Sequence, residues 1–565
     1  MLIGRPAEYN FSSPESGPGT KEAEMQVVSV EQMRAIEKEA DERGVSFAEM
    51  MERAGRGVAE VVVSEYGDED WRVVTALVGS GNNGGDALVA LETLARSGWT
   101  AQAYLVRPRD EKDPLLERAR TAGVLVMAAA QDKKLHGLQE WLENSNVLLD
   151  GVLGTGIQLP LKEEIAAILK YVSEAETVPH VVAIDCPSGV DCNTGEAAAE
   201  TIPAELTLCM QAVKQGLLRF PAFEKVGELR VVNLELPEKL ASLKKIDEFM
   251  VDGEQVAGYL PERPMTAHKG TFGTLMIAAG STYYIGAPLL AARGAYRMGV
   301  GLVRLAVAAP LQASLAGQFP EATWLLLPDE MGMIAEGGAE VLRKNLSRVT
   351  AFLVGPGLGA EETTASFIKN LLTSAETPHQ APSFGFLTSQ EEGEVESGES
   401  PKLPPLVMDA DGLRLMARVD GWPELLPPGS VLTPHPGEMS ALTGLEVAEI
   451  QANRQEVACK FAKKWKTTVI LKGALTVIAA EDGRAYIIPV ASAALAKAGS
   501  GDVLAGIVAG LLAQGRPALE AAVAGAWIHA QAGLEAADQL GGTAPVLASD
   551  VIEAIPRVLW ALRFE

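Results

Sequence analysis

The sequence predicts two α/β domains, each built on a mostly parallel sheet with helices on both faces. Its 565 residues are too many for one ordinary hydrophobic core. Short apolar runs alternate with segments of helical periodicity in both halves of the chain, which is typical of doubly wound sheets. Two glycine-rich loops, at residues 79–86 and 499–502, each lie between a strand-like run and a helix-like run.

The composition limits what the chain can bind. Lys and Arg number 48 and Asp and Glu number 74, so the net charge is −26, which opposes binding to nucleic acid or to an anionic membrane surface. No apolar run reaches the ~20 residues of a membrane span. The four cysteines lack metal-binding spacing, and the first residues lack a secretory pattern. We therefore expect a cytoplasmic protein with buried thiols.

The first half of the chain predicts an extension followed by a Rossmann-like domain at residues 25–236. Residues 1–24 are rich in Pro, Gly, Ser and Glu and predict a flexible extension. Apolar residues at helical spacing between 30 and 63 predict two helices separated near Gly44. Strands are predicted at 73–78, 101–106, 147–149, 181–184, 206–210 and 229–234, and helices at 86–96 and 162–171.

A second α/β pattern follows a charged, irregular stretch at residues 237–260, which predicts a linker. The second domain is expected at residues 261–565. Its strands are predicted at 274–279, 302–307, 351–354, 406–408, 469–471 and 486–490. An acidic, low-complexity stretch at 389–400 predicts a surface insertion, to which we assign no function.

The first glycine-rich loop predicts a binding site. In residues 79–86, Gly84 and Gly85 permit positive φ, and Asp86 is expected where a helix begins. Asp150 and Asp185 each end a predicted strand before another glycine-containing loop, so three loops should converge at the carboxyl ends of the strands. Oxygen ligands from Asn83, Asp150 and Ser188 could surround a hard cation, which leaves Asp185 as the acid/base group. The alternative is that the aspartates only cap turns.

These loops carry a family resemblance. Residues 32–36, 82–86, 153–156 and 183–191 together resemble the NAD(P)H-hydrate epimerase domain over about residues 25–235, although Ala87 stands where that family usually has glycine. The resemblance implies a potassium ion held by Asn83, Asp150 and Ser188, and a catalytic role for Asp185. It implies hydrate binding by Asn82, Asn83, Gly84, Gly85, Asp86, Gly154, Thr155, Gly156, Ile157, Gln158, Leu159, Pro160 and Asp185.

The second glycine-rich loop predicts a phosphoryl-transfer site. Residues 496–506 lead into an apolar helix, so the backbone N–H groups of Gly499, Ser500 and Gly501 can form an anion hole. Asp502 would then take a proton from an attacking hydroxyl, because phosphoryl transfer needs positioning and charge stabilisation more than covalent chemistry. The alternative is a glycine-softened helix start that Asp502 merely caps.

Further fragments extend this second resemblance. Residues 268–273, 355–359, 409–412, 433–438 and 472–476, with the loop at 499–502, resemble the ribokinase-like NAD(P)H-hydrate dehydratase domain over about residues 250–565. The resemblance implies hydrate binding by Ala287, Gly357, His435 and Asp502. It implies adenine-nucleotide binding by Lys472, Gly473, Ala474, Leu475, Thr476 and Gly501. Mg²⁺ is expected with ADP, and Glu438 is a possible ligand.

Together the resemblances imply a bifunctional enzyme that repairs nicotinamide nucleotides. The first domain would epimerise the R and S hydrates of NADH and NADPH (NADHX and NADPHX), and the second would dehydrate the S form with ADP, releasing AMP and phosphate. A homo-oligomer is expected. Two alternatives stay open: a kinase acting on a vitamin or sugar alcohol, and a first domain that is only a binding scaffold in RNA metabolism. The net charge and the intact Asp185, Asn83 and Asp150 weigh against the scaffold.

Overall fold

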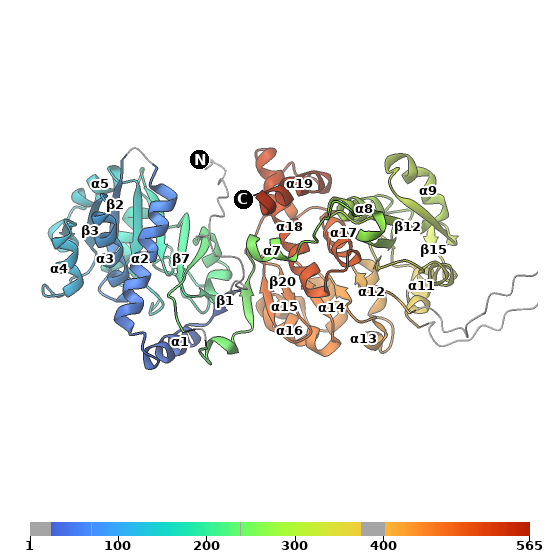
Figure 1. The fold of residues 1–565 in the computed structure, drawn as a ribbon, viewed down its shortest axis with the longest axis horizontal. Helices are drawn as coiled ribbons and strands as arrows, with labels where there is room; N and C mark the ends of the chain where they lie inside the picture. Colours follow the sequence, from blue (N-terminus) through green and yellow to red (C-terminus); the bar gives the residue numbers. More distant parts are fainter. Residues whose placement is uncertain (1–23, 69–70, 238, 374–401, 565) are drawn as a thin grey trace, which may run out of the picture. The chain divides into compact units, whose positions relative to one another are not determined.

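The computed structural model describes residues 24–68, 71–237, 239–373 and 402–564. The chain divides into two compact units, Met25–Met250 and a second unit that takes in Val251–Glu565 (Figure 1). The predicted linker at 237–260 contains β10 (Glu248–Met250) and α7 (Gly253–Tyr259), and the division between the units falls between these two elements. The predicted extension, apart from Glu24, and the acidic stretch at 389–400 lie outside the described residues.

The first unit is built on a parallel sheet, as the alternation of strands and helices predicted. Its strand order is β4-β3-β2-β5-β6-β7-β9, and every neighbouring pair is parallel. The chain passes from β2 through β3 to β4 and then continues on the other side of β2, which places a topological switch point between β2 and β5. The strands are β2 (Val73–Val78), β3 (Thr100–Leu105), β4 (Leu125–Ala128), β5 (Val147–Gly151), β6 (His180–Ile184), β7 (Leu206–Met210) and β9 (Glu228–Val232).

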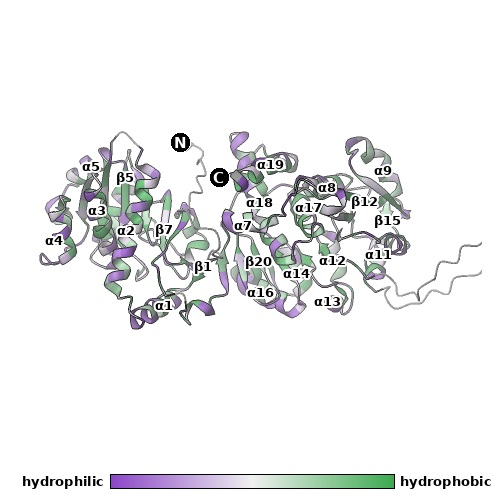
Figure 2. Cartoon of the chain, viewed as in Figure 1, coloured by the Kyte–Doolittle hydropathy of each residue, from purple (hydrophilic) through white to green (hydrophobic). Residues whose placement is uncertain are grey.

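Six helices cover the two faces of this sheet. Buried apolar side chains of α1, α2, α3 and α4 pack on one face, and those of α5 and α6 pack on the other. Figure 2 shows the apolar colouring of the strands between helices whose outer faces are hydrophilic. The helices are α1 (Val30–Glu42), α2 (Phe47–Tyr66), α3 (Asn82–Arg96), α4 (Pro114–Thr121), α5 (His136–Glu143) and α6 (Glu163–Ser173).

The start of the first unit follows the predicted pattern. Ser29 and Gln32 form a capping box at the start of α1, in which each side chain accepts a hydrogen bond from the other residue's backbone N–H. The chain then turns at Gly44, whose φ of 101° suits glycine, before α2 begins. The two predicted helices and their break are therefore confirmed.

Three short strands of the first unit were not predicted. β1 (Met25–Val28) pairs antiparallel with β10 and parallel with β8 (Val213–Lys214). Strands of two to four residues are too short to show a period of two in the sequence, so pattern analysis misses them. Lys214 lies at the end of β8.

The second unit has a mixed sheet, with the order β13-β12-β11-β16-β17-β18-β19-β20-β21. The pairs from β13 to β19 are parallel, whereas β19, β20 and β21 are antiparallel. A switch point lies between β11 and β16. The strands are β11 (Thr274–Ala278), β12 (Leu302–Ala308), β13 (Thr323–Leu327), β16 (Ala351–Val354), β17 (Leu406–Met408), β18 (Val431–Leu432), β19 (Thr468–Leu471), β20 (Val477–Ala479), β21 (Ala485–Ile487) and the hairpin β14 (Asp329–Glu330) and β15 (Met333–Ile334).

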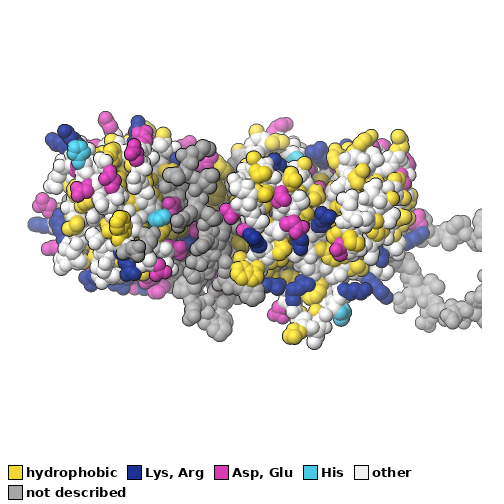
Figure 3. All heavy atoms as spheres, turned by 90° about the horizontal axis from the view of Figure 1, so that it is seen from above, with side chains coloured by type: hydrophobic (Ala, Val, Ile, Leu, Met, Phe, Trp, Pro, Cys, Tyr) yellow, Lys and Arg dark blue, Asp and Glu magenta, His cyan; other side chains and the backbone are white. Residues whose placement is uncertain are grey.

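Helix α17 of the second unit is apolar on nearly all sides, as the sequence predicted. None of the helices within the described residues is long and apolar enough to cross a membrane. On the face seen in Figure 3, acidic and basic side chains are interspersed. Besides α7, the helices are α8 (Ala287–Arg297), α9 (Ala309–Leu315), α10 (Gly338–Lys344), α11 (Glu362–Thr373), α12 (Asp411–Met416), α13 (Trp422–Leu425), α14 (Pro436–Thr443), α15 (Val447–Ala452), α16 (Arg454–Trp465), α17 (Ser500–Ala513), α18 (Ala518–Gln539) and α19 (Ala548–Phe564).

Candidate active sites

The first glycine-rich loop is shorter than predicted. Helix α3 begins at Asn82 instead of Asp86, and Gly81 is its N-cap. Gly84 and Gly85 lie in the helix, so the expectation that they serve positive φ is wrong. They are needed for close packing, since a Cβ at Gly84 would lie 2.1 Å from the Gly79 carbonyl oxygen and one at Gly85 would lie 2.7 Å from the sulfur of Met51.

The three predicted cation ligands lie together at the switch point of the first unit. Asp150 is fully buried at the end of β5, and its carboxylate accepts hydrogen bonds from the Ser188 N–H (2.7 Å) and hydroxyl (2.5 Å). The Asn83 amide donates to the carbonyls of Leu153 (2.9 Å) and Ile184 (2.8 Å), and the Leu153 N–H donates to the Ser188 hydroxyl (2.8 Å). Asn83 and Ser188 thus both bond to the Leu153 backbone, and Asp150 joins them through Ser188.

The donor set fits a potassium ion. It offers only oxygen atoms, the type of ligand that hard cations prefer. Burial raises the pKa of Asp150, hydrogen bonds from Ser188 oppose that rise, and no basic side chain pairs with this carboxylate in the described part of the chain. A monovalent cation would supply the missing positive charge. The described residues hold no group of three or more His, Cys, Asp or Glu side chains that could bind a metal ion, so a site here would depend on amide and hydroxyl oxygens.

Asp185 lies at the carboxyl end of β6, the next strand of the same sheet, and is held by the buried side chain of Lys214. One carboxylate oxygen, Oδ1, accepts hydrogen bonds from the Met210 N–H (3.0 Å) and from the Lys214 ammonium. The other oxygen has no hydrogen-bond partner among the described residues. Asp185 also has a φ of 65°, a left-handed conformation that few residues other than Gly, Asn and Asp adopt. Sequence reasoning missed Lys214, which lies in an unremarkable run after β7.

Two further carboxyl groups lie near this ion pair. Burial raises the pKa of Asp86 well above its usual value, and the neighbouring charges of Asp185 and Glu37 add to the effect. Burial likewise raises the pKa of Glu37 on α1, although the charge of Lys214 opposes it. The predicted cap residue Asp86 is therefore a buried group in the interior of α3 whose neutral form is favoured.

The predicted substrate loop after β5 borders the cation ligands. A Cβ at Gly154 would lie 3.4 Å from the side-chain oxygen of Asn83. The following residues, Thr155, Gly156, Ile157, Gln158, Leu159 and Pro160, are half-buried or exposed. Their contact with the hydrate stays a prediction.

In the second unit, three neighbouring strands converge on one polar cluster. Asp409 follows β17, Thr433 follows β18 and Lys472 follows β19. The Asp409 carboxylate accepts hydrogen bonds from the Thr433 hydroxyl (2.7 Å) and the Lys472 ammonium (2.6 Å), and a Glu438 oxygen lies 3.6 Å from that ammonium. Burial alone would lower the pKa of Lys472, but Asp409 and Glu438 outweigh it and raise the pKa, so the ammonium stays charged.

The predicted anion hole lies beside this cluster. Gly499 is the N-cap of α17 with a φ of 86°, and a Cβ there would lie 2.6 Å from a methyl group of Leu290. A Cβ at Gly501 would lie 3.6 Å from the Lys472 ammonium, which places that positive charge beside the N–H groups of the helix start. Of the three predicted donors, the Ser500 N–H donates to the Lys497 carbonyl at 3.3 Å. The Ser500 hydroxyl lies 3.1 Å from Nε2 of the buried His529 on α18, a contact that the sequence did not indicate.

Asp502 lies in the first turn of α17. Burial raises its pKa to about 7, the charges of Asp409 and Asp411 contribute to the rise, and Lys472 opposes it. A carboxylate with a pKa near neutrality suits a general base, because it is available in its ionised form and still accepts a proton.

The remaining predicted hydrate contacts lie at the switch point between β11 and β16. Gly357 has a φ of 63°, and a Cβ there would lie 2.6 Å from that of Tyr284 and 2.9 Å from that of Ala287. Ala287 is the first residue of α8, which packs closely against α17. The two helices share the end at which Leu290 approaches Gly499, so the predicted contacts and Asp502 belong to one region.

His435 has a structural role in addition to its predicted ligand role. It is the N-cap of α14, where its Nδ1 accepts a hydrogen bond from the Gly437 N–H (2.9 Å) and Glu438 accepts one from the His435 N–H (2.8 Å). Burial lowers the pKa of His435. With Nδ1 as acceptor, the neutral ring carries its proton on Nε2, which lies 3.2 Å from Glu438.

The predicted nucleotide loop at residues 472–476 follows β19. Its backbone is held by Arg454, which donates to the carbonyls of Leu471 (2.9 Å) and Lys472 (3.3 Å). Within the loop, the Thr476 hydroxyl donates to the Gly473 carbonyl (2.8 Å), and Leu475 has a φ of 54°. Ala474 is exposed between them.

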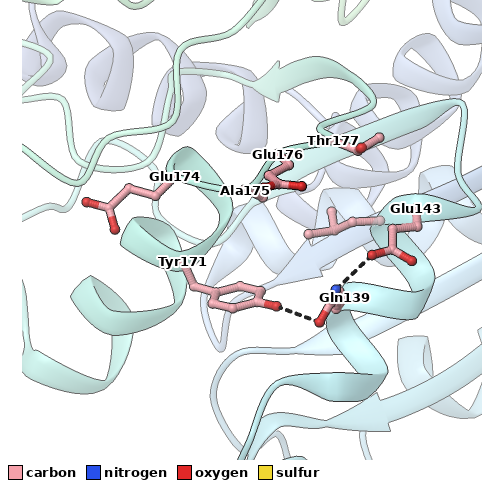
Figure 4. Close-up of a pocket in the computed structure, with 8 residues that line it drawn as sticks. Gln139, Glu143, Tyr171, Glu174, Ala175, Glu176 and Thr177 are labelled. Atoms are coloured by element: carbon pink, nitrogen blue, oxygen red, sulfur yellow. Dashed lines mark hydrogen bonds between the residues drawn. The ribbon is translucent and has the colours of Figure 1, made fainter.

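A separate pocket of about 390 Å³ opens between α5 and α6 (Figure 4). Its rim includes Gln139, which donates to Glu143 (2.8 Å) and accepts from the Tyr171 hydroxyl (3.4 Å). The lining comes from the ends of α5 and α6 that precede β5 and β6, so this pocket lies at the opposite edge of the sheet from Asp150 and Asp185. It is not part of the candidate site.

Two protein families match this chain, one in each half. The family described as YjeF-related protein N-terminus matches residues 47–216, and the family described as NAD(P)H-hydrate dehydratase matches residues 275–378 and 391–557. An ADP/ATP-dependent NAD(P)H-hydrate dehydratase from Bacillus subtilis, co-crystallised with ATP/Mg²⁺, is 28% identical, covers 55% of this chain and 98% of its own, and has a TM-score of 0.43.

Other relatives match the chain over nearly its whole length, and so across both units. A bifunctional NAD(P)H-hydrate repair enzyme from Thermofilum pendens is 33% identical over 545 residues, which is 95% of this chain and 97% of that protein. One from Escherichia coli is 32% identical over 531 residues, 93% of this chain and 92% of that protein. With both domain families matched in order and full-length relatives above 30% identity, the chain belongs to the family of bifunctional NAD(P)H-hydrate repair enzymes.

Proposed function

We propose that the unit at Met25–Met250 epimerises the R and S hydrates of NADH and NADPH, and that the second unit dehydrates the S hydrate with ADP as phosphoryl donor. The observation that carries the proposal is the first turn of α17, where Asp502, with a pKa of about 7, lies in the same region as the Lys472 ammonium and the N–H groups at the start of the helix.

In the proposed epimerase site, Asp185 is the acid/base group that exchanges the proton at the hydrated carbon. Its unpartnered oxygen is available for this, because the Met210 N–H and Lys214 occupy only the other oxygen. Asp86, in its neutral form, can donate a hydrogen bond to a hydroxyl of the hydrate. A potassium ion held by Asn83, Asp150 and Ser188 would supply positive charge beside the bound hydrate.

In the proposed dehydratase site, Asp502 accepts the proton of the hydrate's hydroxyl, and the oxygen attacks the terminal phosphorus of ADP. The bond from that phosphorus to the bridging oxygen breaks, and AMP leaves. The phosphate ester then loses phosphate from the same carbon while the neighbouring carbon loses a proton, which restores the double bond of the dihydronicotinamide. Phosphate is a better leaving group than hydroxide, which is why a kinase-like site serves a dehydration.

The anion hole and Lys472 stabilise negative charge on the transferred phosphoryl group. Mg²⁺ bound with ADP would neutralise the remaining phosphate charge, and Glu438 is the carboxylate we propose near it. The hydrate would contact Ala287, Gly357 and His435, and the nucleotide would contact residues 472–476 and Gly501. Oligomerisation and a cytoplasmic location stay predictions from the sequence.

The test is incubation of the protein with mixed R and S NADH hydrate, Mg²⁺ and either ADP or ATP. We expect full recovery of the absorbance of the reduced nicotinamide, with one AMP and one phosphate released per hydrate when ADP is the donor. Recovery of the S fraction alone would contradict the epimerase. A phosphorylated product that persists without regained absorbance would instead establish a small-molecule kinase.

A further inference from the structure

Lys214 is a buried cation that the proposed reaction does not yet use. Its side chain is 1% exposed, and its three ammonium hydrogens have three acceptors: the Asp185 carboxylate and the carbonyl oxygens of Met210 (3.0 Å) and Ala212 (3.1 Å). Burial disfavours its charge, but attraction to Asp185 outweighs this and raises the pKa of Lys214 above its usual value. Lys214 is therefore a fixed positive charge with no hydrogen left for a substrate.

Burying the Lys214–Asp185 ion pair costs free energy if the pair serves only to hold the fold together. Removing an ammonium and a carboxylate from water costs several kcal/mol per ion, and apolar side chains of similar volume often stabilise a fold as well or better. The charge of Lys214 therefore calls for an explanation beyond packing. Its position on β8, between the end of β7 and the site, lets it reach the one carboxylate assigned to chemistry.

Several titratable groups lie near the Lys214 ammonium, and it bonds to the carboxylate of Asp185. Asp86 on α3 and Glu37 on α1 both lie close enough to Asp185 to feel its charge, and both have raised pKa values. The thiols of Cys186 and Cys209, whose pKa values are also raised, lie near Asp185 too, with Cys192 beside both thiols and Arg34 beside Glu37. Lys214 makes a direct hydrogen bond to Asp185 alone among the three carboxyl groups.

We propose that Lys214 is a positioning residue of the epimerase site, whose ammonium fixes one oxygen of Asp185 and so leaves the other oxygen of that carboxylate for the substrate. The Met210 and Ala212 carbonyl oxygens hold the ammonium in place, and the Met210 N–H shares the oxygen that Lys214 binds. The carboxylate is thereby held in one orientation, as a group that must meet a reacting atom requires. This inference rests on the proposed epimerase activity of the first unit.

The test compares Lys214→Gln, which removes the charge, with Lys214→Arg, which keeps it, in the full-length chain. In Lys214→Gln, we expect epimerase kcat to fall at least about tenfold, because a displaced carboxylate meets the reacting atom less well. We expect KM to change less than about threefold, because Lys214 does not touch the hydrate. Lys214→Arg should keep kcat closer to the wild-type value than Lys214→Gln does.

Internal controls separate this role from a structural one. Dehydratase activity on the S hydrate, measured in the same variants, should stay at the wild-type level. Lys170→Met, which removes an exposed lysine on α6 that pairs with Glu174 at 3.9 Å, should change neither activity. In an Asp185→Asn background, adding Lys214→Gln should cost no further epimerase activity, because Lys214 acts through Asp185.

Several outcomes would overturn the inference. One is a wild-type kcat in Lys214→Gln; another is a further loss in the Asp185→Asn background. If Lys214→Gln does not fold, Lys214→Arg decides the matter: a kcat more than about tenfold below the wild-type value in the folded protein, despite the retained charge, contradicts the proposal. Absence of epimerase activity in the wild-type protein would refute the proposed function itself, and is therefore a distinguishable result.

Discussion

The two aspartates proposed for catalysis, Asp185 and Asp502, have opposite electrostatic surroundings. Asp185 has an ammonium group of its own, since Lys214 bonds to it directly. Asp502 does not, because the nearby Lys472 bonds to Asp409 and pairs with Glu438, while burial and the charges of Asp409 and Asp411 raise the pKa of Asp502. The same type of side chain is thus paired with a cation in one unit and placed near other carboxylates in the other.

The largest expected effect is the separation of the two activities by Asp502→Asn. We expect dehydratase kcat to fall about 10²–10⁴-fold, the usual contribution of a general base, while epimerisation continues at the wild-type rate. Initial rates with pure S hydrate and ADP measure the first, and NMR of the R and S hydrates measures the second. Dehydration at a near wild-type rate would show that Asp502 is not the base.

The reciprocal substitution, Asp185→Asn, should produce the opposite pattern. Asn tolerates the left-handed φ of 65° at this position, so the backbone should be retained. We expect epimerisation to fall about 10²–10⁴-fold, with dehydration of the S hydrate unchanged. Because the substitution leaves Lys214 without its countercharge, a melting curve should accompany the rates. Epimerisation that survives in a folded Asp185→Asn protein would place the first catalytic centre elsewhere.

The pH dependence sharpens the comparison further. Asp502 acts as a base only when ionised, and its pKa is about 7, so dehydratase kcat should be on a plateau well above pH 7 and fall about tenfold per unit well below it. Dehydratase rates across a series of buffers in which the protein stays folded test this expectation. A flat dehydratase profile between pH 5.5 and 8 would contradict the assignment.

The smallest expected effect concerns the fit of the substrate loop in the second unit. Gly357→Ala should destabilise that unit by about 1–3 kcal/mol, because its Cβ would meet those of Tyr284 and Ala287. KM for the hydrate should rise in the dehydratase assay and not in the epimerase assay. Gly286→Ala is the matched control, since its Cβ would have no neighbour within 4 Å. Equal behaviour of the two variants would show that Gly357 is not a close-approach position.

The sequence predicts much of the fold and of both sites because strands and the loops that follow them are local signals. Asp150 and Asp185 each follow an apolar run, so the amino-acid pattern alone predicts that they converge at the carboxyl ends of parallel strands in the first unit. Asp502 precedes an apolar run, which predicts its place at the start of a helix in the second unit. The start of α3 was misplaced because the glycines after Asn83 are associated with loops. Only the neighbouring backbone at Gly79 and the side chain of Met51 show that these glycines serve packing.

The groups that tune the aspartates could not be predicted in the same way. Lys214 lies 29 residues after Asp185, on a two-residue strand, and His529 lies 29 residues after Ser500, inside an apolar helix. Neither position has a local pattern that indicates its partner. The burial of Asp86 and Glu37 near Asp185 likewise depends on distances that only the folded chain determines.

The central claim is that each unit performs one half of the repair. The most direct test mixes the Asp185→Asn and Asp502→Asn proteins and gives them R hydrate, ADP and Mg²⁺, over a time in which uncatalysed epimerisation is small. Neither variant alone should restore the absorbance of the reduced nicotinamide, whereas the mixture should restore it fully, because one protein supplies the epimerase and the other the dehydratase. Failure of the mixture, although each variant retains its remaining activity, would contradict two independently acting sites.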